Sequence, residues 1–245
     1  MRKTMTMIRR LATLCAILAG LAAGSAIASE AAIRQSFQAR FPNAVVESVA
    51  RTPFAGIYEV VFNGQIAYTD EKLNFVFFGN LVDLRAGAER NLTRERNAQM
   101  AAQSLRKSAD NAVKRVRGNG KRVLYTFEDP NCGYCRELQK ELMKLSDVTI
   151  YTFLWPILSP DSIDKSRAVW CAKDRAKAWD DMMSRGVTPQ NSAKCDAPFE
   201  KNHELAQRFG IRGTPAVFLG DGRQVGAGYV PAAELEQALN SVAAK

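Results

Sequence analysis

Two cysteines lie three positions apart in the stretch FEDPNCGYC, residues 127–135. Cys132 and Cys135 follow a strand-like apolar run, KRVLYTF (121–127), and precede a helical pattern, CRELQKELMKL (135–145). Such a pair can be half of a zinc site, a structural disulfide, or a redox centre in which two thiols and a disulfide interconvert. The residues around the pair distinguish these three chemistries.

A zinc site is the first alternative, and it needs about four ligands. The other cysteines of the region, Cys171 and Cys195, do not form a second C-x-x-C, and His203 is the chain's only histidine. No set of Cys and His ligands therefore presents itself, and we expect no metal. A purely structural bond within C-x-x-C would close a tight, strained loop. Because short loops constrain the unfolded chain little, such a bond would stabilise the fold poorly.

The position of the pair favours redox chemistry. Cys132 falls in the first turn of the predicted helix, where unpaired N–H groups and the helix dipole stabilise a thiolate. Cys135 lies one turn further on the same face, from which it can attack a mixed disulfide and release a substrate. The sequence therefore predicts a redox-active cysteine pair.

The first residues indicate the compartment. The segment MRKTMTMIRR has four basic residues and no acid, and the apolar run LATLCAILAGLAAGSAIA follows it and ends in Ala26-Ile27-Ala28. A basic start, a short apolar run and an A-x-A end predict an export signal peptide over residues 1–28, cleaved after Ala28. The alternative is a retained transmembrane anchor. The run is rich in Ala and Gly and interrupted by Thr and Ser, which favours the signal peptide.

Removal of that segment also removes Cys15 and leaves four cysteines, an even number that predicts disulfides in an oxidising compartment. It lowers the formal net charge from +9 to +5. The positive excess lies between Arg85 and Arg122, with 11 basic residues against three acidic ones. Such a stretch could bind nucleic acid or a membrane surface. It lacks interleaved aromatic residues, so we interpret it as a solvated helix and expect no nucleic-acid partner.

Residues 29–85 predict a small α+β unit. The periodicity of residues 31–41 predicts a helix that stops at Pro42. Alternating or apolar runs then predict about four antiparallel strands, at 44–49, 57–62, 65–69 and 73–78, with a weaker one at 81–84. Asn63-Gly64 is a strong signal for a two-residue hairpin between the second and third of these strands.

A helical pattern follows over residues 91–117, with a thin stripe of alanines and valines that suits an exposed connecting helix. Gly118-Asn119-Gly120 ends it. We therefore predict a stiff spacer over residues 86–118. Residues 119–245 then alternate strand, helix, strand, helices, hairpin and helix, an α/β order with helices flanking one sheet.

Four motifs of this chain resemble a known family. They are FEDPNCGYC, VWCAKDRAKAWDDMM (169–183), GTPAVFL (213–219) and GYVP (228–231). Together they resemble the DsbC/DsbG family of bacterial periplasmic disulfide isomerases, which belongs to the thioredoxin superfamily. The CGYC sequence favours the DsbC type, because DsbG-type proteins carry proline after the first cysteine. The resemblance implies an α/β thioredoxin-like catalytic domain with a helical insertion, preceded by a small cystatin-like dimerisation domain (α+β) and a linker helix.

The resemblance also implies roles for the cysteine pair. Cys132 would be the nucleophile and Cys135 the resolving thiol, with Gly133 and Tyr134 forming the active-site loop between them. The residue six positions before the nucleophile, a buried carboxylate in thioredoxins, is Thr126 here. Whether Glu128 or Asp129 substitutes for that carboxylate stays open at this stage.

Two further pairs take roles from the same resemblance. Thr214 and Pro215 would hold a cis peptide bond that faces the cysteines and pairs with the substrate backbone. Cys171 and Cys195 would form a structural disulfide, the alternatives being free thiols or a second redox pair.

The implied function is that of a periplasmic, homodimeric thiol:disulfide isomerase without a cofactor or a membrane anchor. It would act on wrong disulfides in exported proteins and be kept reduced by a membrane thiol reductase of the DsbD type. Two alternatives are a dedicated disulfide reductase or oxidase, and a holdase-type chaperone of the DsbG kind.

Overall fold

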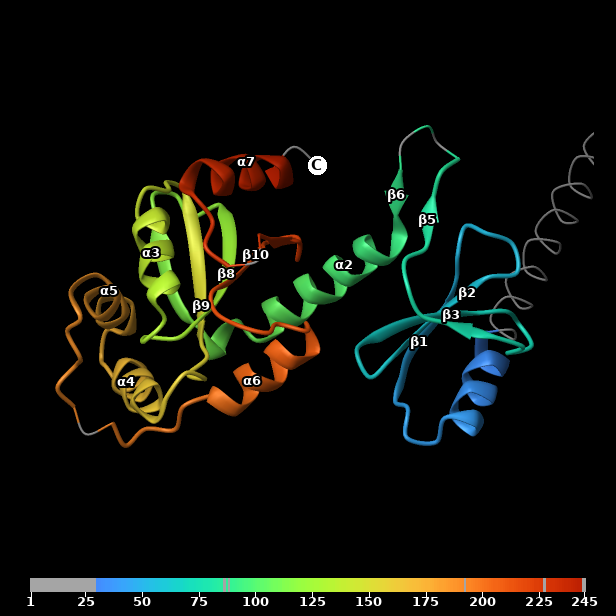
Figure 1. Ribbon diagram of the computed structural model, residues 1–245, viewed down its shortest axis with the longest axis horizontal. Helices are drawn as coiled ribbons and strands as arrows, with labels where there is room; N and C mark the ends of the chain where they lie inside the picture. The colour runs from blue at the N-terminus through green and yellow to red at the C-terminus, as the bar shows by residue number, and fades with distance from the viewer. Residues whose placement is uncertain (1–29, 86, 88, 192, 227, 244–245) are drawn as a thin grey trace, which may run out of the picture. The chain divides into compact units, whose positions relative to one another are not determined.

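The computed structural model describes residues 30–85, 87, 89–191, 193–226 and 228–243 (Figure 1). The predicted signal peptide lies outside these residues. The chain divides into two compact units, one ending at Thr93 and the other beginning at Arg94. Within the described ranges, no helix combines the length and the apolar character needed to cross a membrane.

The first unit packs a helix over residues 30–40 against an antiparallel sheet in the order β1-β2-β3-β4. Its strands are β1 (Val46–Arg51), β2 (Tyr58–Phe62), β3 (Gln65–Thr69) and β4 (Val76–Phe77). Ile33 and Phe37 of the helix are buried in the core of this unit. The predicted hairpin is confirmed: Asn63 and Gly64 both have positive φ angles, 48° and 74°, as a tight turn between twisted strands requires.

A second, two-stranded ribbon completes this unit. The predicted weak strand near residue 82 is β5 (Val82–Asp83), which pairs with β6 (Arg90–Asn91). We did not predict β6, because a two-residue strand has too few side chains to show an alternating pattern.

The second unit is built on a five-stranded sheet in the order β11-β10-β8-β9-β7. β8 and β9 are parallel, and the other neighbours are antiparallel. The strands are β7 (Val113–Arg117), β8 (Arg122–Glu128), β9 (Val148–Leu154), β10 (Ala216–Leu219) and β11 (Gln224–Val225). The helical segments are α2 (Leu92–Lys107), η1 (Ala109–Asn111), α3 (Gly133–Leu142), α4 (Pro160–Trp170), α5 (Arg175–Arg185), α6 (Phe199–Arg208) and α7 (Ala232–Ala243).

Helices cover both faces of this sheet (Figure 1). α3 and α7 pack on one face, around Leu124, Ile150 and Val217. α2 and α6 pack on the other face, against a layer of aromatic side chains that includes Phe127 and Phe153. The predicted α/β order with flanking helices is therefore confirmed. The helical insertion is two helices, α4 and α5. They pack on each other, and α5 also packs on α3.

The predicted helix over 91–117 is wrong in its second half. α2 ends at Lys107, and Val113–Arg117 form the edge strand β7. Val113 and Val116 are three residues apart, which we took as a helical step. In the structure the period is two: Val113 and Arg115 are buried, whereas Val116 is 56% exposed. Position 115 would have shown the strand's alternation if it were apolar, but it carries an arginine.

The predicted exposed spacer is also wrong for the second half of α2. Ala101 and Leu105 are buried against the aromatic face of the sheet. The turn at Gly222, between β10 and β11, lies directly on this helix. A Cβ atom at Gly222 would come within 1.9 Å of the Ala98 carbonyl oxygen, and its φ of +85° also favours glycine. α2 is therefore part of the core of the second unit.

Candidate active site

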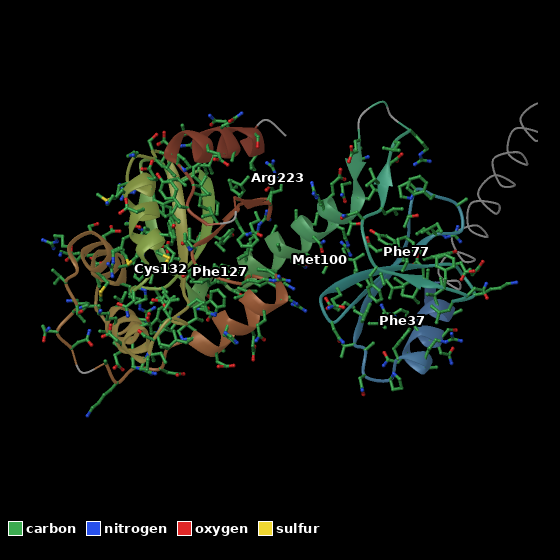
Figure 2. All side chains as sticks on the ribbon, viewed as in Figure 1. Phe37, Phe77, Met100, Phe127, Cys132 and Arg223 are labelled. Carbon is green, nitrogen blue, oxygen red and sulfur yellow. A yellow bond between two sulfur atoms is a disulfide. The ribbon has the colours of Figure 1, made fainter. Side chains whose placement is uncertain are left out.

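Cys132 is the N-cap residue of α3, at the point where the chain leaves β8 and turns into the helix (Figure 2). Its Sγ accepts a hydrogen bond from the backbone N–H of Cys135 at 3.2 Å. As a thiol it also donates to the carbonyl oxygen of Thr214 at 3.3 Å. The Cys132 side chain therefore caps the N-terminus of α3, and the positive end of the helix dipole faces its sulfur atom. Both cysteines of the pair are buried, and the structure has no bond between their sulfur atoms.

The two thiols have opposite pKa shifts. Hydrogen bonds, first from Cys135 and then at Thr214 and the Tyr134 backbone, lower the pKa of Cys132 to about 6 despite its burial. Burial raises the pKa of Cys135 far above its ordinary value, and the nearby charge of Glu128 adds to the effect. At neutral pH Cys132 is therefore the thiolate and Cys135 keeps its proton.

A buried polar cluster lies under the pair, on the face of the sheet that α3 covers. Strand alternation puts Thr126 and Glu128 of β8 on the same face as Leu124, which packs against α3. Glu128 is fully buried, and its Oε1 accepts from Thr126 Oγ1 at 2.7 Å. Its Oε2 has no hydrogen-bond partner among the described residues. Burial raises the pKa of Glu128, and Arg115 partly offsets this.

Arg115 provides the positive charge of this cluster, and sequence reasoning missed it. Its guanidinium lies 4.0 Å from Glu128 Oε1 and donates to Thr152 Oγ1 at 2.9 Å. It also donates to Gln139 Oε1 at 2.7 Å, and Gln139 lies one turn after Cys135 on α3. The carboxyl group beneath the pair is thus supplied by Glu128, at the end of β8, while Thr126 is its hydrogen-bond donor. No local pattern in VKRVR could have located Arg115, because the two valines are three positions apart and the buried middle position carries the charge itself.

Asp129 is equally buried but has a different role. Its Oδ1 accepts from the backbone N–H of Asn131 and from Ser162 Oγ, both at 2.8 Å. Its Oδ2 accepts from the backbone N–H groups of Ile157 and Leu158, at 2.8 and 3.0 Å. Asp129 therefore joins the segment before Cys132 to the loop between β9 and α4. Its hydrogen-bonding capacity is used by this connection rather than directed to the cysteines.

The remaining candidates lie as follows. The Thr214–Pro215 peptide bond is cis, and the carbonyl oxygen of Thr214 faces Cys132 Sγ. Tyr134 is 70% exposed, at the first turn of α3, and Gly133 precedes it with open space around its Cα. The structure thus brings both members of the active-site loop and the Thr214–Pro215 turn to the cysteine pair.

Cys171 and Cys195 form a disulfide with a Cα–Cα distance of 5.5 Å. Cys171 caps the C-terminus of α4, and Cys195 lies in the segment between α5 and α6. The bond closes a loop that contains α5, a helix packed against the active-site helix α3. His203 is bonded elsewhere: its two ring nitrogens are within hydrogen-bonding distance of Trp155 Nε1 and Gln207 Nε2.

Replacing both cysteines of this disulfide by serine should lower the free energy of unfolding by roughly 3 kcal/mol, because the unfolded chain regains the freedom of a loop of about 25 residues. The rate at which the folded variant reduces a small disulfide should stay within about twofold of wild type. Urea unfolding and a stopped-flow reduction assay measure the two quantities. A large loss of exchange rate in a variant that unfolds at the wild-type urea concentration would contradict a structural role.

Comparison with known proteins agrees with this geometry. A family model described as a thioredoxin-like domain matches residues 109–243, and one described as the N-terminal domain of disulfide bond isomerase proteins matches residues 24–94. A probable thiol:disulfide interchange protein DsbC of Bordetella parapertussis is 45% identical over 209 residues, which cover 85% of this chain and 73% of that protein. The DsbC of Escherichia coli K12 is 29% identical over 222 residues, with coverage of 89% and 90%.

A solved structure is similar to part of this chain. The disulfide interchange protein from Neisseria gonorrhoeae aligns with a TM-score of 0.52 and 42% sequence identity, over 55% of this chain and 96% of that one. The thioredoxin-like fold and the preceding isomerase-type N-terminal domain are thus both present. The chain belongs to the DsbC-type family of thiol:disulfide interchange proteins.

Proposed function

We propose that this protein is a periplasmic thiol:disulfide isomerase that corrects wrong disulfides in exported proteins. The observation that supports this most strongly is the placement of the two thiols: Cys132 caps the start of α3 and accepts from the Cys135 N–H, while Cys135 is completely buried. An isomerase needs a nucleophile that is ionised at neutral pH and leaves readily, and a second thiol that does not compete for the substrate. The predicted export signal and the disulfide between Cys171 and Cys195 support an oxidising compartment.

The reaction begins when the Cys132 thiolate attacks one sulfur of a substrate disulfide. The substrate S–S bond breaks, a bond between Cys132 and the substrate forms, and the other substrate sulfur leaves as a thiolate. If a different substrate thiolate then attacks the substrate sulfur of the mixed disulfide, Cys132 leaves unchanged and the substrate is isomerised without net oxidation.

The second outcome is reduction. Cys135 loses its proton and attacks Cys132 Sγ, which forms the Cys132–Cys135 disulfide and leaves the substrate two electrons more reduced. The raised pKa of Cys135 makes this step slow, which gives a substrate thiol time to complete the isomerisation first. An oxidised enzyme must then be reduced again, and we propose a membrane thiol reductase as the electron donor.

We further propose that the N-terminal unit forms a homodimer. β4 is an edge strand of its sheet in the described residues. Phe75, Phe77 and Phe78, in or beside this strand, are 42%, 37% and 63% exposed. An exposed apolar edge favours pairing with another strand, and a second copy of the chain supplies an identical one.

The test is the recovery of activity of a scrambled, disulfide-bonded enzyme in the presence of the reduced protein. Wild type should restore activity, and Cys132→Ser should abolish the effect because no nucleophile remains. Cys135→Ser should keep initial attack but accumulate mixed disulfides, visible on non-reducing gels. Reduction of the scrambled protein without recovery of activity would indicate a dedicated reductase. Prevention of aggregation by Cys132→Ser at the wild-type level, without any recovery of activity by wild type, would indicate a holdase.

A further inference from the structure

Any substrate of the proposed reaction is covalently bound at Cys132, and this inference rests on that proposed function. The residues next to the attacked substrate cysteine must therefore lie against the surface that surrounds Cys132. This surface includes Tyr134 of the active-site loop and the Thr214–Pro215 turn. The loop between β9 and α4 is hydrogen-bonded to the segment directly before Cys132, and no role has been assigned to it.

This loop carries two exposed aliphatic side chains. Ile157 is 40% exposed and Leu158 is 55% exposed. Single exposed apolar residues are common on protein surfaces and need no explanation by themselves. These two are adjacent, and the active-site loop adds a third exposed large side chain, Tyr134, at 70%.

The loop is also fixed to the nucleophile segment by the polar network around it. Asp129, three residues before Cys132, binds the backbone N–H groups of both Ile157 and Leu158 through one carboxylate oxygen. Asn131, directly before Cys132, donates from Nδ2 to acceptors that follow the two aliphatic residues, Ser159, Asp161 and Ser162, at 2.8–3.1 Å. Because Asp129 binds backbone N–H groups, it holds the loop in one position and leaves the side chains of Ile157 and Leu158 free.

One ion pair lies beside the loop. Lys165 pairs with Asp161 at 2.6 Å and also donates to Asn131 Oδ1 at 2.9 Å. The fixed position of the loop lowers the entropic cost of binding, since no loop ordering is needed when a substrate arrives. On α4, which follows the loop, Asp164 is exposed and has no ion-pair partner among the described residues, whereas Ile157 and Leu158 themselves offer apolar contact.

We propose that Ile157 and Leu158, together with Tyr134, bind apolar side chains that flank the cysteine of a substrate disulfide. The surface would direct Cys132 towards disulfides in apolar sequence surroundings. In a correctly folded protein such segments are buried, and in a misoxidised one they are accessible. The loop would thereby contribute to the choice of substrate, while the Cys132–Cys135 pair carries out the chemistry.

The test uses two short peptides with one internal disulfide each, one with leucines and one with serines beside the attacked cysteine. The second-order rate constant for attack by the reduced protein is measured for both in single-turnover experiments. Wild type should prefer the leucine peptide roughly tenfold, the scale of discrimination by small apolar contacts. The double variant Ile157→Ser with Leu158→Ser should react with the serine peptide at the wild-type rate and prefer the leucine peptide less than about twofold.

Met143→Ser is the matched control. Met143 is 49% exposed, similar to the two loop residues, and caps the opposite end of α3 from Cys132. This variant should keep the tenfold preference. Equal rates for the two peptides with wild type, or an undiminished preference in the double variant, would overturn the inference. Failure of wild type to react with either peptide would reject the proposed function itself, and the inference with it.

Discussion

Cys132 should react with iodoacetamide at pH 7 at least about a hundred times faster than Cys135 in the fully reduced protein. With a pKa of about 6, Cys132 is about nine-tenths thiolate at this pH. Cys135 is completely buried, and its pKa is raised by that burial and by the charge of Glu128, so almost no thiolate is present. Only the thiolate is nucleophilic, which makes the difference in rate large.

The pH dependence provides the sharper measurement. Because the pKa of Cys132 is lowered, its alkylation rate should increase through about pH 6 and be nearly constant above about pH 7. An unperturbed cysteine would continue to gain rate until about pH 8.5 or higher. Mass spectrometry of tryptic peptides after timed quenching separates the two sites. A rate at Cys132 that rises mainly above pH 8, or faster modification of Cys135, would contradict the assignment of the nucleophile.

A fragment of residues 94–245 should fold, whereas a fragment of residues 119–245 should not. The shorter fragment lacks α2 and β7. It would expose the aromatic layer around Phe127 and Phe153, and it would remove Arg115 from the buried carboxyl of Glu128. Loss of one partner of a buried ion pair typically costs about 3–5 kcal/mol, a large part of the stability of a small domain. Circular dichroism and thermal unfolding of the two fragments test this expectation.

The folded longer fragment then separates exchange chemistry from dimerisation. It retains Cys132, Cys135 and the Thr214–Pro215 turn, so it should reduce a small disulfide at close to the wild-type rate. We expect it to be monomeric in light scattering. Its activity on a scrambled protein should be much lower than that of residues 29–245. If residues 29–245 are monomeric, or if the fragment isomerises as well as residues 29–245, the proposed role of the N-terminal unit is contradicted.

The sequence by itself determined the features that depend on neighbouring residues. The C-x-x-C pair between a strand and a helix, the Asn63-Gly64 hairpin and the order of strands and helices after residue 119 follow from local signals. Turn chemistry, helix ends and hydrophobic periodicity act within a few positions, so they can be recognised without knowledge of the fold. The family resemblance added the cis bond before Pro215 and the bond between Cys171 and Cys195, which no local rule predicts.

Only the tertiary structure decided which polar residues are buried and with what partners. Arg115 looked like one more charge on a solvated helix. It is buried because Gln139, Asp180 and Glu128, which lie 13 to 65 positions away in the chain, surround its guanidinium. The loop at Ile157 is fixed by Asp129, 28 positions earlier. Burial of a charge and anchoring of a loop depend on partners that meet only when the sheet is assembled, and a pattern of neighbouring residues carries no trace of such pairs.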